Sequence, residues 1–430
     1  MKKLLIAATV VLVSSSPLVL LPMEKELTLT PKQVQKLTQN TTASLTQFKQ
    51  IPKNPRTITT ILTYKNKDLT EFKTSIQADT KLSISAIFWN AKGEPVFQLQ
   101  DGDYVAASQK SIVDDSIYNQ KPVDMTFWTK DGLTVYKEPY VLGTEKADSK
   151  LASFKPIKVS QAAQTHAGTY YLVDGEGWIN ASDLSMTDNR IEAVQKVLNE
   201  KYNNQERISV YVKQLDTDRV AAINDEKSMY AASVAKLGVL YYAQERLSQK
   251  KLSLSDEYQY TSAVNGFPGA YDPDGSGKIS KMPDDKNYSL ENLLKAVAQN
   301  SDNVATNILG YYVTNQYDKA FQKSVDKAAA TSWNMDKKEL TARAAGTLME
   351  AVYRQNGDII TYLSSTDYDG ERISKNIDVP VAHKIGDAYD FKHDVAIVYA
   401  DSPFILSIFT DKEGYDKITS IADDVYGILK

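Results

Sequence analysis

The spacing of hydrophobic and polar residues changes twice along this chain of 430 residues. Residues 24–57 are polar and weakly periodic, which predicts a spacer or one marginal helix. Residues 58–186 contain short runs of alternating apolar and polar positions between Gly and Asp turns, which predicts an all-β region. From residue 189 on, strand-like and helix-like runs alternate. The pattern therefore predicts a multidomain protein, with an all-β part before an α/β part.

The all-β region contains a faint repeat with a period of about 73 residues. The segments 97–108 and 170–182 share a strand, an Asp-Gly turn and an aromatic strand that ends in Ala-Ser. Such a repeat predicts two small β modules in tandem, which we place at 58–120 and 121–187.

Strand patterns at both ends of the α/β part enclose a middle block of helices. Residues 207–224 predict a hairpin, and residues 393–409 predict two further strands before a last helix. In the middle block, apolar residues with helical spacing predict a helix that is capped by Ser289 and leads to Ser301. We therefore expect one domain over 188–430, with an antiparallel sheet closed by both of its ends.

The composition narrows the classes of partner and chemistry. The net charge is −4 and the sequence has no long basic run, which argues against a nucleic-acid partner. The sequence has no cysteine, which excludes disulfides and a cysteine nucleophile. It has three histidines, so a zinc centre would be poorly supplied with ligands. Residues 272–279 read like the start of a calcium loop, but Pro283 stands where a bidentate Glu is required. We expect no metal and no cofactor.

The N-terminus has the features of an export segment. Lys2 and Lys3 precede an apolar run over residues 4–23, and no clear cleavage site follows. The segment 1–23 is therefore a signal peptide or, as we favour, an uncleaved membrane anchor. Either predicts an extracellular protein at the cell surface, and the composition suits a Gram-positive bacterium.

Three short motifs in the α/β part carry the chemistry. They are, in chain order, Ser233-Val-Ala-Lys236, Ser301-Asp302-Asn303 and Lys384-Ile385-Gly386. The pattern S-x-x-K alone says little, because it also occurs at Ser248 and Ser324. Only Ser233 follows a strand pattern, opens an apolar helix and is followed by the other two motifs.

Ser233 and Lys236 are the candidate nucleophile and base. A serine hydroxyl needs a base within hydrogen-bond reach, and positions i and i+3 share one face of a helix. Burial and the positive charge of Lys384 would lower the pKa of Lys236, so that its amine can accept a proton. A helix that begins at Ser233 also offers free backbone N–H groups to an oxyanion.

The other two motifs supply candidate partners for the reaction. The hydroxyl of Ser301 can pass a proton to the departing amine, and the amide of Asn303 can bind a substrate amide, whereas Asp302 fits a structural role. Lys384, on a predicted edge strand, offers a cation to a substrate carboxylate. The backbone around Gly386 can approach an extended ligand closely and pair with it like a strand.

The three motifs resemble those of the penicillin-recognising serine hydrolases, in particular the class A β-lactamase-like branch, over roughly residues 190–430. The resemblance implies a β-lactamase/transpeptidase-like fold, with acylation of Ser233 and activation by Lys236. It also implies an oxyanion hole formed by the backbone N–H groups of Ser233 and Asp387. The implied ligand is a β-lactam or a peptidoglycan stem peptide that ends in D-Ala-D-Ala.

Two departures from that family's pattern predict slow turnover. Ile385 stands where the family has Thr or Ser, which weakens recognition of a substrate carboxylate. The family's deacylating glutamate has no match, and residues 333–349 look like its loop cut short and the helix that follows. Glu339 precedes Thr341, a candidate helix cap, and fits a helix-start carboxylate better than a catalytic one. We expect acylation to be intact and deacylation to be slow.

The second β module also resembles a known class. Gly177-Trp178-Ile179 closes a segment that begins near Phe127, in the manner of bacterial SH3-like wall-binding modules of the GW type. The modules would then bind a cell-wall polymer, or they only space the enzyme from the membrane. Two functions follow for the whole chain: a surface serine hydrolase of the β-lactamase or D,D-peptidase type, or a non-catalytic wall-binding protein that uses the hydrolase fold as scaffold or sensor.

Overall fold

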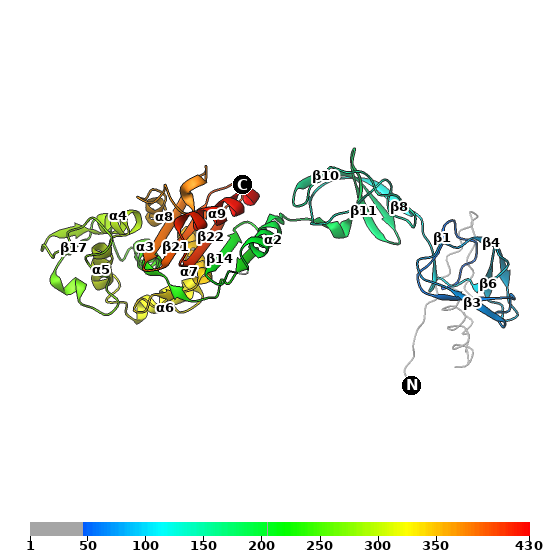
Figure 1. Cartoon of the computed structure of the whole chain (residues 1–430), viewed down its shortest axis with the longest axis horizontal. Coiled ribbons are helices and arrows are strands. Elements are labelled where there is room, and N and C mark those ends of the chain that lie inside the picture. Colours follow the sequence, from blue (N-terminus) through cyan, green and yellow to red (C-terminus); the bar gives the residue numbers. More distant parts are fainter. Residues whose placement is uncertain (1–45, 204) are drawn as a thin grey trace, which may run out of the picture. The chain divides into compact units, whose positions relative to one another are not determined.

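The computed structural model describes residues 46–203 and 205–430, which form two all-β units and an α/β domain (Figure 1). The predicted signal or anchor at 1–23 and the first part of the predicted spacer lie outside the described residues. Among the residues that are described, no helix is long and apolar enough to cross a membrane.

The first β unit has a five-stranded antiparallel sheet with the order β3-β2-β6-β5-β4, and a separate pair of strands, β1 and β7. Buried side chains such as Phe97, Val105 and Ile112 form its core. Its strands are β1 (Pro55–Thr57), β2 (Ile61–Tyr64), β3 (Phe72–Ile76), β4 (Ile84–Trp89), β5 (Pro95–Leu99), β6 (Tyr104–Ala106) and β7 (Ile112–Asp114).

This unit begins before residue 58, where the sequence analysis places its start. The ring of Phe48 lies 5.5 Å from that of Phe97, and Arg56 of β1 pairs with Val113 of β7. The predicted spacer is therefore wrong for its described part, 46–57. Strand β1 has only three residues and its partner strand is distant in sequence, so no alternating run reveals it.

The second β unit has a six-stranded antiparallel sheet with the order β13-β8-β10-β11-β12-β9. Phe127, Ile157 and Ile179 belong to its core, and Tyr170 and Trp178 belong to a smaller cluster of buried rings. Its strands are β8 (Asn119–Thr129), β9 (Val135–Tyr136), β10 (Pro156–Thr165), β11 (Gly168–Val173), β12 (Gly177–Asn180) and β13 (Leu184–Ser185).

The two β units repeat one set of pairings, as the sequence repeat predicts. The order β2-β6-β5-β4 in the first corresponds to β9-β12-β11-β10 in the second. The buried hydroxyl of Thr57 donates to the carbonyl of Gln77 at 2.7 Å and accepts the N–H of Thr80 at 2.9 Å. The hydroxyl of Thr129 likewise donates to Ala152 at 2.7 Å and accepts an N–H three residues further on, at 3.0 Å. The repeat therefore reflects two copies of one all-β arrangement.

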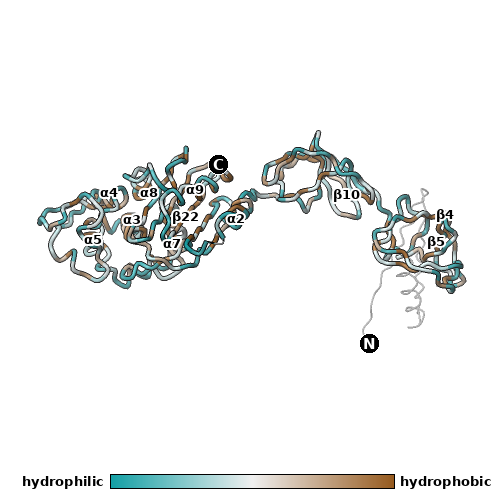
Figure 2. Tube along the Cα trace, viewed as in Figure 1, coloured by the Kyte–Doolittle hydropathy of each residue, from teal (hydrophilic) through white to brown (hydrophobic). Residues whose placement is uncertain are grey.

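The α/β domain is built on a five-stranded antiparallel sheet with the order β15-β14-β22-β21-β20. Both ends of the domain contribute strands, as predicted, and β20 is an edge strand. Hydrophobic residues make up most of β22, a central strand (Figure 2), because helices cover both faces of the sheet. The strands are β14 (Ile208–Gln214), β15 (Val220–Ile223), β20 (Val381–Ala388), β21 (Phe391–Val398) and β22 (Phe404–Asp411).

The helices divide between the two faces. α2 (Arg190–Lys201) and α9 (Tyr415–Leu429) pack on one face. The opposite face carries the helical block: α3 (Leu237–Ser248), α4 (Leu290–Asn300), α5 (Asn303–Tyr312), α6 (Lys319–Ala329), α7 (Ala342–Gln355) and α8 (Asp358–Leu363). Two short pairs complete the domain, β16 (Met229–Tyr230) with β19 (Glu339–Leu340) and β17 (Glu257–Gln259) with β18 (Asn287–Ser289).

Candidate active site

Ser233 lies in a tight turn between the sheet and the helical block. The turn is a 3-10 helix over Ala232–Lys236, and α3 begins directly after it. The α-helix therefore begins at Leu237 rather than at the serine, which corrects the predicted start; 3-10 turns are frequent at helix ends. Ala232 has a left-handed backbone with φ 48°, and Ser233 is 7% exposed. The turn thus holds the serine at the surface of the core.

Lys236 is fully buried beneath this turn. Its Nζ donates to the carbonyl of Ser301 at 2.7 Å and to Oδ1 of Asn303 at 2.5 Å. The described residues show no hydrogen bond between Lys236 and Ser233. Burial, and then the positive charge of Lys384, hold the pKa of Lys236 well below its usual value, although Asp302 opposes this. The amine is thus kept in a form that can accept a proton.

Ser301 occupies the reversal between α4 and α5. The helix that leads to it is capped by Ser289, as predicted, and ends at Ser301 in a left-handed conformation with φ 54°. Its side chain is buried, and Oγ accepts a hydrogen bond of 2.7 Å from Nζ of Lys384. Nζ of Lys384 therefore touches the hydroxyl of Ser301, and Nζ of Lys236 touches its carbonyl.

Asp302 has the structural role that the sequence analysis expects. Its Oδ1 caps α5 by accepting the N–H of Ala305 at 2.9 Å. Its Oδ2 accepts the N–H groups of Lys278 and Ile279, at 2.6 and 2.9 Å. A Cβ at Gly277 would lie 2.2 Å from this carboxyl group, so the loop can approach only as glycine. The segment that reads like a calcium loop is thus packed against the second motif.

Asn303 is engaged at both ends of its amide. Nδ2 donates to the carbonyl of Asp272 at 2.7 Å, and Oδ1 accepts from Lys236. The residue is only 8% exposed. The side chain therefore holds Lys236 in position, a role that the sequence does not predict; the expected contact with a substrate amide stays a prediction.

Lys384 and Gly386 bring the edge strand to the nucleophile turn. Lys384 is 1% exposed; burial lowers its pKa to about 7, although Asp394 opposes the change. A Cβ at Gly386 would lie 2.6 Å from the carbonyl oxygen of Ala231 and 3.0 Å from Cγ2 of Val234. Strand β20 can therefore lie this close to the turn of Ser233 only because residue 386 has no side chain.

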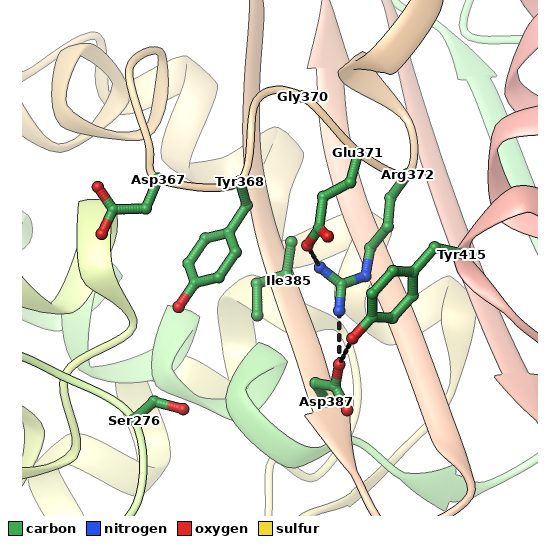
Figure 3. Close-up of a pocket in the computed structure, with 9 residues that line it drawn as sticks. All are labelled: Ser276, Asp367, Tyr368, Gly370, Glu371, Arg372, Ile385, Asp387 and Tyr415. Atoms are coloured by element: carbon green, nitrogen blue, oxygen red, sulfur yellow. Dashed lines mark hydrogen bonds and ion pairs between the residues drawn. The ribbon is translucent and has the colours of Figure 1, made fainter.

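An open cleft of about 640 Å³ borders the end of β20 (Figure 3). Ile385 lines it with an apolar side chain. Arg372 lies over the ring of Tyr415, with its Cζ 3.9 Å from the centroid, and donates to Asp387 at 2.8 Å. The lining residues are Ser276, Asp367, Tyr368, Gly370, Glu371, Arg372, Ile385, Asp387 and Tyr415.

Sequence reasoning missed two residues beside the motifs, Tyr271 and Lys338. Tyr271 donates from its hydroxyl to the carbonyl of Ala232 at 3.2 Å. Lys338 is 6% exposed, whereas Glu339, the predicted helix-start carboxylate, is exposed. Thr341 caps α7, as predicted. Neither missed residue belongs to a motif, and no local pattern marks it.

The predicted site residues thus divide into two groups. Lys236, Ser301, Asn303 and Lys384 are joined by hydrogen bonds into one buried network. The turn of Ser233 lies next to that network and against Gly386, and Asp387 follows on the same strand. The arrangement can support proton transfer next to a serine hydroxyl.

Family models match two separate parts of the chain. A model of the family described as the Beta-lactamase enzyme family matches residues 189–429. A model described as a domain of unknown function (DUF5776) matches residues 47–113, which begin near the observed start of the first β unit. No curated protein matches the chain.

Several solved structures are similar to a part of this chain. PBP-A is 15% identical with a TM-score of 0.46, over 56% of this chain and 95% of its own. The β-lactamase from Sphaerobacter thermophilus is 15% identical with a TM-score of 0.45, over 55% and 94%. The TLA-3 extended-spectrum β-lactamase is 18% identical with a TM-score of 0.46, over 56% and 99%. Since the family model at 189–429 spans more than half of the chain, the chain belongs to the Beta-lactamase enzyme family.

Proposed function

We propose that the chain is a serine hydrolase of the class A type that forms an acyl-enzyme on Ser233 with β-lactams or D-Ala-D-Ala-type peptides. The observation that carries the proposal is the buried network in which Lys236 and Lys384 both contact Ser301 next to the turn of Ser233. A depressed lysine pKa beside a serine is the arrangement that activates a hydroxyl without a histidine.

In the proposed reaction, Oγ of Ser233 attacks the carbonyl carbon while its proton passes to the neutral amine of Lys236. The backbone N–H groups of Ser233 and Asp387 bind the oxyanion. Ser301 donates its proton to the departing nitrogen as the C–N bond breaks, and the proton held by Lys236 returns to Ser301. The contact between Lys236 and Ser233 forms when substrate binds, because catalytic hydrogen bonds are often long without it.

Slow release of the acyl group belongs to the same proposal. Hydrolysis needs a base that activates water beside the ester. In the segment that replaces the family's catalytic loop, the buried titratable residue is Lys338, and Glu339 is exposed. Neither residue is a buried carboxylate that could take a proton from water, so the acyl-enzyme is expected to persist, as in a D,D-peptidase treated with a β-lactam.

Intact-mass analysis after exposure to penicillin G tests this function. We expect one added penicilloyl mass, lost in Ser233→Ala and kept in Ser248→Ala. Ser248 is a matched control, because it begins the same S-x-x-K pattern but is exposed at the end of α3. Release over hours indicates a peptidase, whereas release over seconds indicates a β-lactamase. An unmodified mass at every penicillin concentration contradicts the proposal.

We also propose that the β units are SH3-like and bind a cell-wall polymer, with residues 1–23 directing the chain to the cell surface. Exposed rings on the first unit support this: Phe72 is 58% and Trp89 is 56% exposed, and the rings of Phe88 and Tyr104 lie 6.2 Å apart. Such rings can stack on a flat ligand. Cosedimentation with purified peptidoglycan should weaken in Trp89→Ala and Phe72→Ala but not in Met282→Ala, an exposed residue of the α/β domain.

If wall binding persists and no acylation is found, the non-catalytic alternative is favoured. The α/β domain would then serve as scaffold or ligand sensor. The two measurements are independent, because the substituted residues lie in different folded units.

A further inference from the structure

The ring of Tyr271 contacts two buried lysines. Nζ of Lys236 is 4.4 Å from its centroid, and Nζ of Lys338 is 4.5 Å from the same centroid. Tyr271 is 8% exposed and donates its hydroxyl to the carbonyl of Ala232, the residue before the nucleophile. Burial raises the pKa of Tyr271 well above its usual value, so the ring stays neutral and adds no negative charge. Two basic groups thus share one apolar partner directly beneath Ser233.

Lys338 is held in place by its backbone and by its side chain. Its carbonyl accepts the N–H of Ala231 at 2.7 Å, and its Nζ donates to the carbonyl of Gly269 at 3.0 Å. Among the ion pairs of the described residues, none involves Lys338. Burial lowers the pKa of Lys338, and Asp336 opposes this from the exposed side of the same segment. Any charge on Lys338 therefore acts on its surroundings without a paired carboxylate.

Lys236 is surrounded by groups from several elements. Lys384 on β20, Lys338 before β19 and Lys281 in the loop after residue 279 all disfavour its protonated form, and Asp302 at the start of α5 favours it. Of these groups, Lys384 and Asp302 make other contacts in the network or its loop. Lys338 makes no hydrogen bond to any predicted site residue. Its effect on Lys236 is therefore electrostatic.

We propose that Lys338 is a positioning residue whose charge, held against the same ring of Tyr271, keeps Lys236 in the neutral form that accepts the proton of Ser233. The inference rests on the proposed function, since it assigns Lys338 a part in acylation. Lys338 acts only through Lys236, by like-charge repulsion in a site that water does not screen. The segment that lacks a deacylating carboxylate would thus contribute to the first step of the reaction.

The pH profile of acylation by penicillin G tests this inference. In Lys338→Met the repulsion is lost, so Lys236 stays protonated to higher pH. We expect the acid limb of the profile to move up by about one pH unit and the rate on that limb to fall about tenfold. Lys338→Arg keeps the charge and should keep the limb. Lys337→Met is the matched control, because Lys337 is the adjacent lysine in the sequence and is exposed.

A limb that stays in place while the rate falls at every pH would overturn the inference, because Lys338 would then only anchor the loop at Gly269. Lys338→Gln, which can still donate a hydrogen bond, gives the same comparison if Lys338→Met does not fold. Titration of Lys236 by NMR of its Cε nucleus measures the effect without any ligand. An unshifted titration in Lys338→Met contradicts this inference alone, whereas failure of the unaltered protein to acylate contradicts the proposed function.

Discussion

Nζ of Lys384 donates a hydrogen bond of 2.7 Å to Oγ of Ser301, although the two residues are 83 positions apart in the sequence. The bond connects the edge of the sheet to the reversal between α4 and α5. It places the amine of the third motif on the hydroxyl of the second, so in the proposed reaction the charge state of Lys384 would affect both proton transfer and ligand binding.

The first prediction concerns the alkaline side of the acylation profile. Burial lowers the pKa of Lys384 to about 7, so its positive charge is lost as pH rises through that value. We expect the second-order rate constant for penicillin G to fall roughly tenfold per pH unit above 7, because the ligand carboxylate loses its cation. Lys384→Arg should move this fall upward, since a guanidinium stays charged. An identical fall in both proteins would assign the titration to another group.

A second prediction concerns the close approach at Gly386. Gly386→Ala would place Cβ 2.6 Å from the carbonyl oxygen of Ala231, so β20 or the nucleophile turn must shift. We expect a loss of about 1–3 kcal/mol in the free energy of unfolding and a marked loss of acylation. The matched control is Gly427→Ala in α9, where a Cβ would meet nothing within 4 Å. There we expect a gain of roughly 0.5–1 kcal/mol and unchanged acylation, measured by urea unfolding and labelling.

Asp302 provides the third prediction. Asp302→Ala removes the acceptor of three backbone N–H groups, from Ala305, Lys278 and Ile279. We expect a loss on the order of 3 kcal/mol in the free energy of unfolding, together with weaker acylation, because the loop no longer fixes the second motif. Asp318→Ala removes the cap of α6 and an exposed hydrogen bond from Asn315, and should cost about 1 kcal/mol without changing acylation. Equal effects of the two substitutions would contradict the assigned role.

The fourth prediction concerns pH and stability. Burial lowers the pKa of His383, but Asp394 and Asp369, at 3.0 and 3.1 Å, outweigh it and raise the pKa to about 9. This raised value stabilises the folded state fully below about pH 6.5, and the contribution is lost as pH rises through about 9. We therefore expect the free energy of unfolding of the unaltered protein, relative to that of His383→Gln, to be higher by roughly 3 kcal/mol below about pH 6.5 than above about pH 9.

Urea unfolding at pH 6, 7.5 and 9.5 measures that difference. Burial lowers the pKa of His393 to about 4, which makes the opposite contribution to the pH dependence of stability. Because His393 is present in both proteins, this contribution cancels in the difference. A difference that is independent of pH would contradict a charged His383.

Local signals in the sequence determined much of the fold and of the site. Helical spacing behind Ser289 predicted α4, the Thr341 cap predicted α7, and alternation predicted both β units, because each of these depends on residues a few positions apart. The three motifs marked Ser233, Lys236, Ser301 and Lys384 for the same reason. Strand β1 was missed because its pairing partner lies far along the chain.

The tertiary structure alone decided how these residues meet. It showed that Asn303 holds Lys236, and it placed Tyr271 and Lys338 beneath the nucleophile. Such contacts join segments that are tens of residues apart, and a buried lysine has the same local pattern as an exposed one. Sequence spacing therefore specifies elements and motifs, whereas burial and like-charge proximity, which set a pKa, arise only when distant elements pack together.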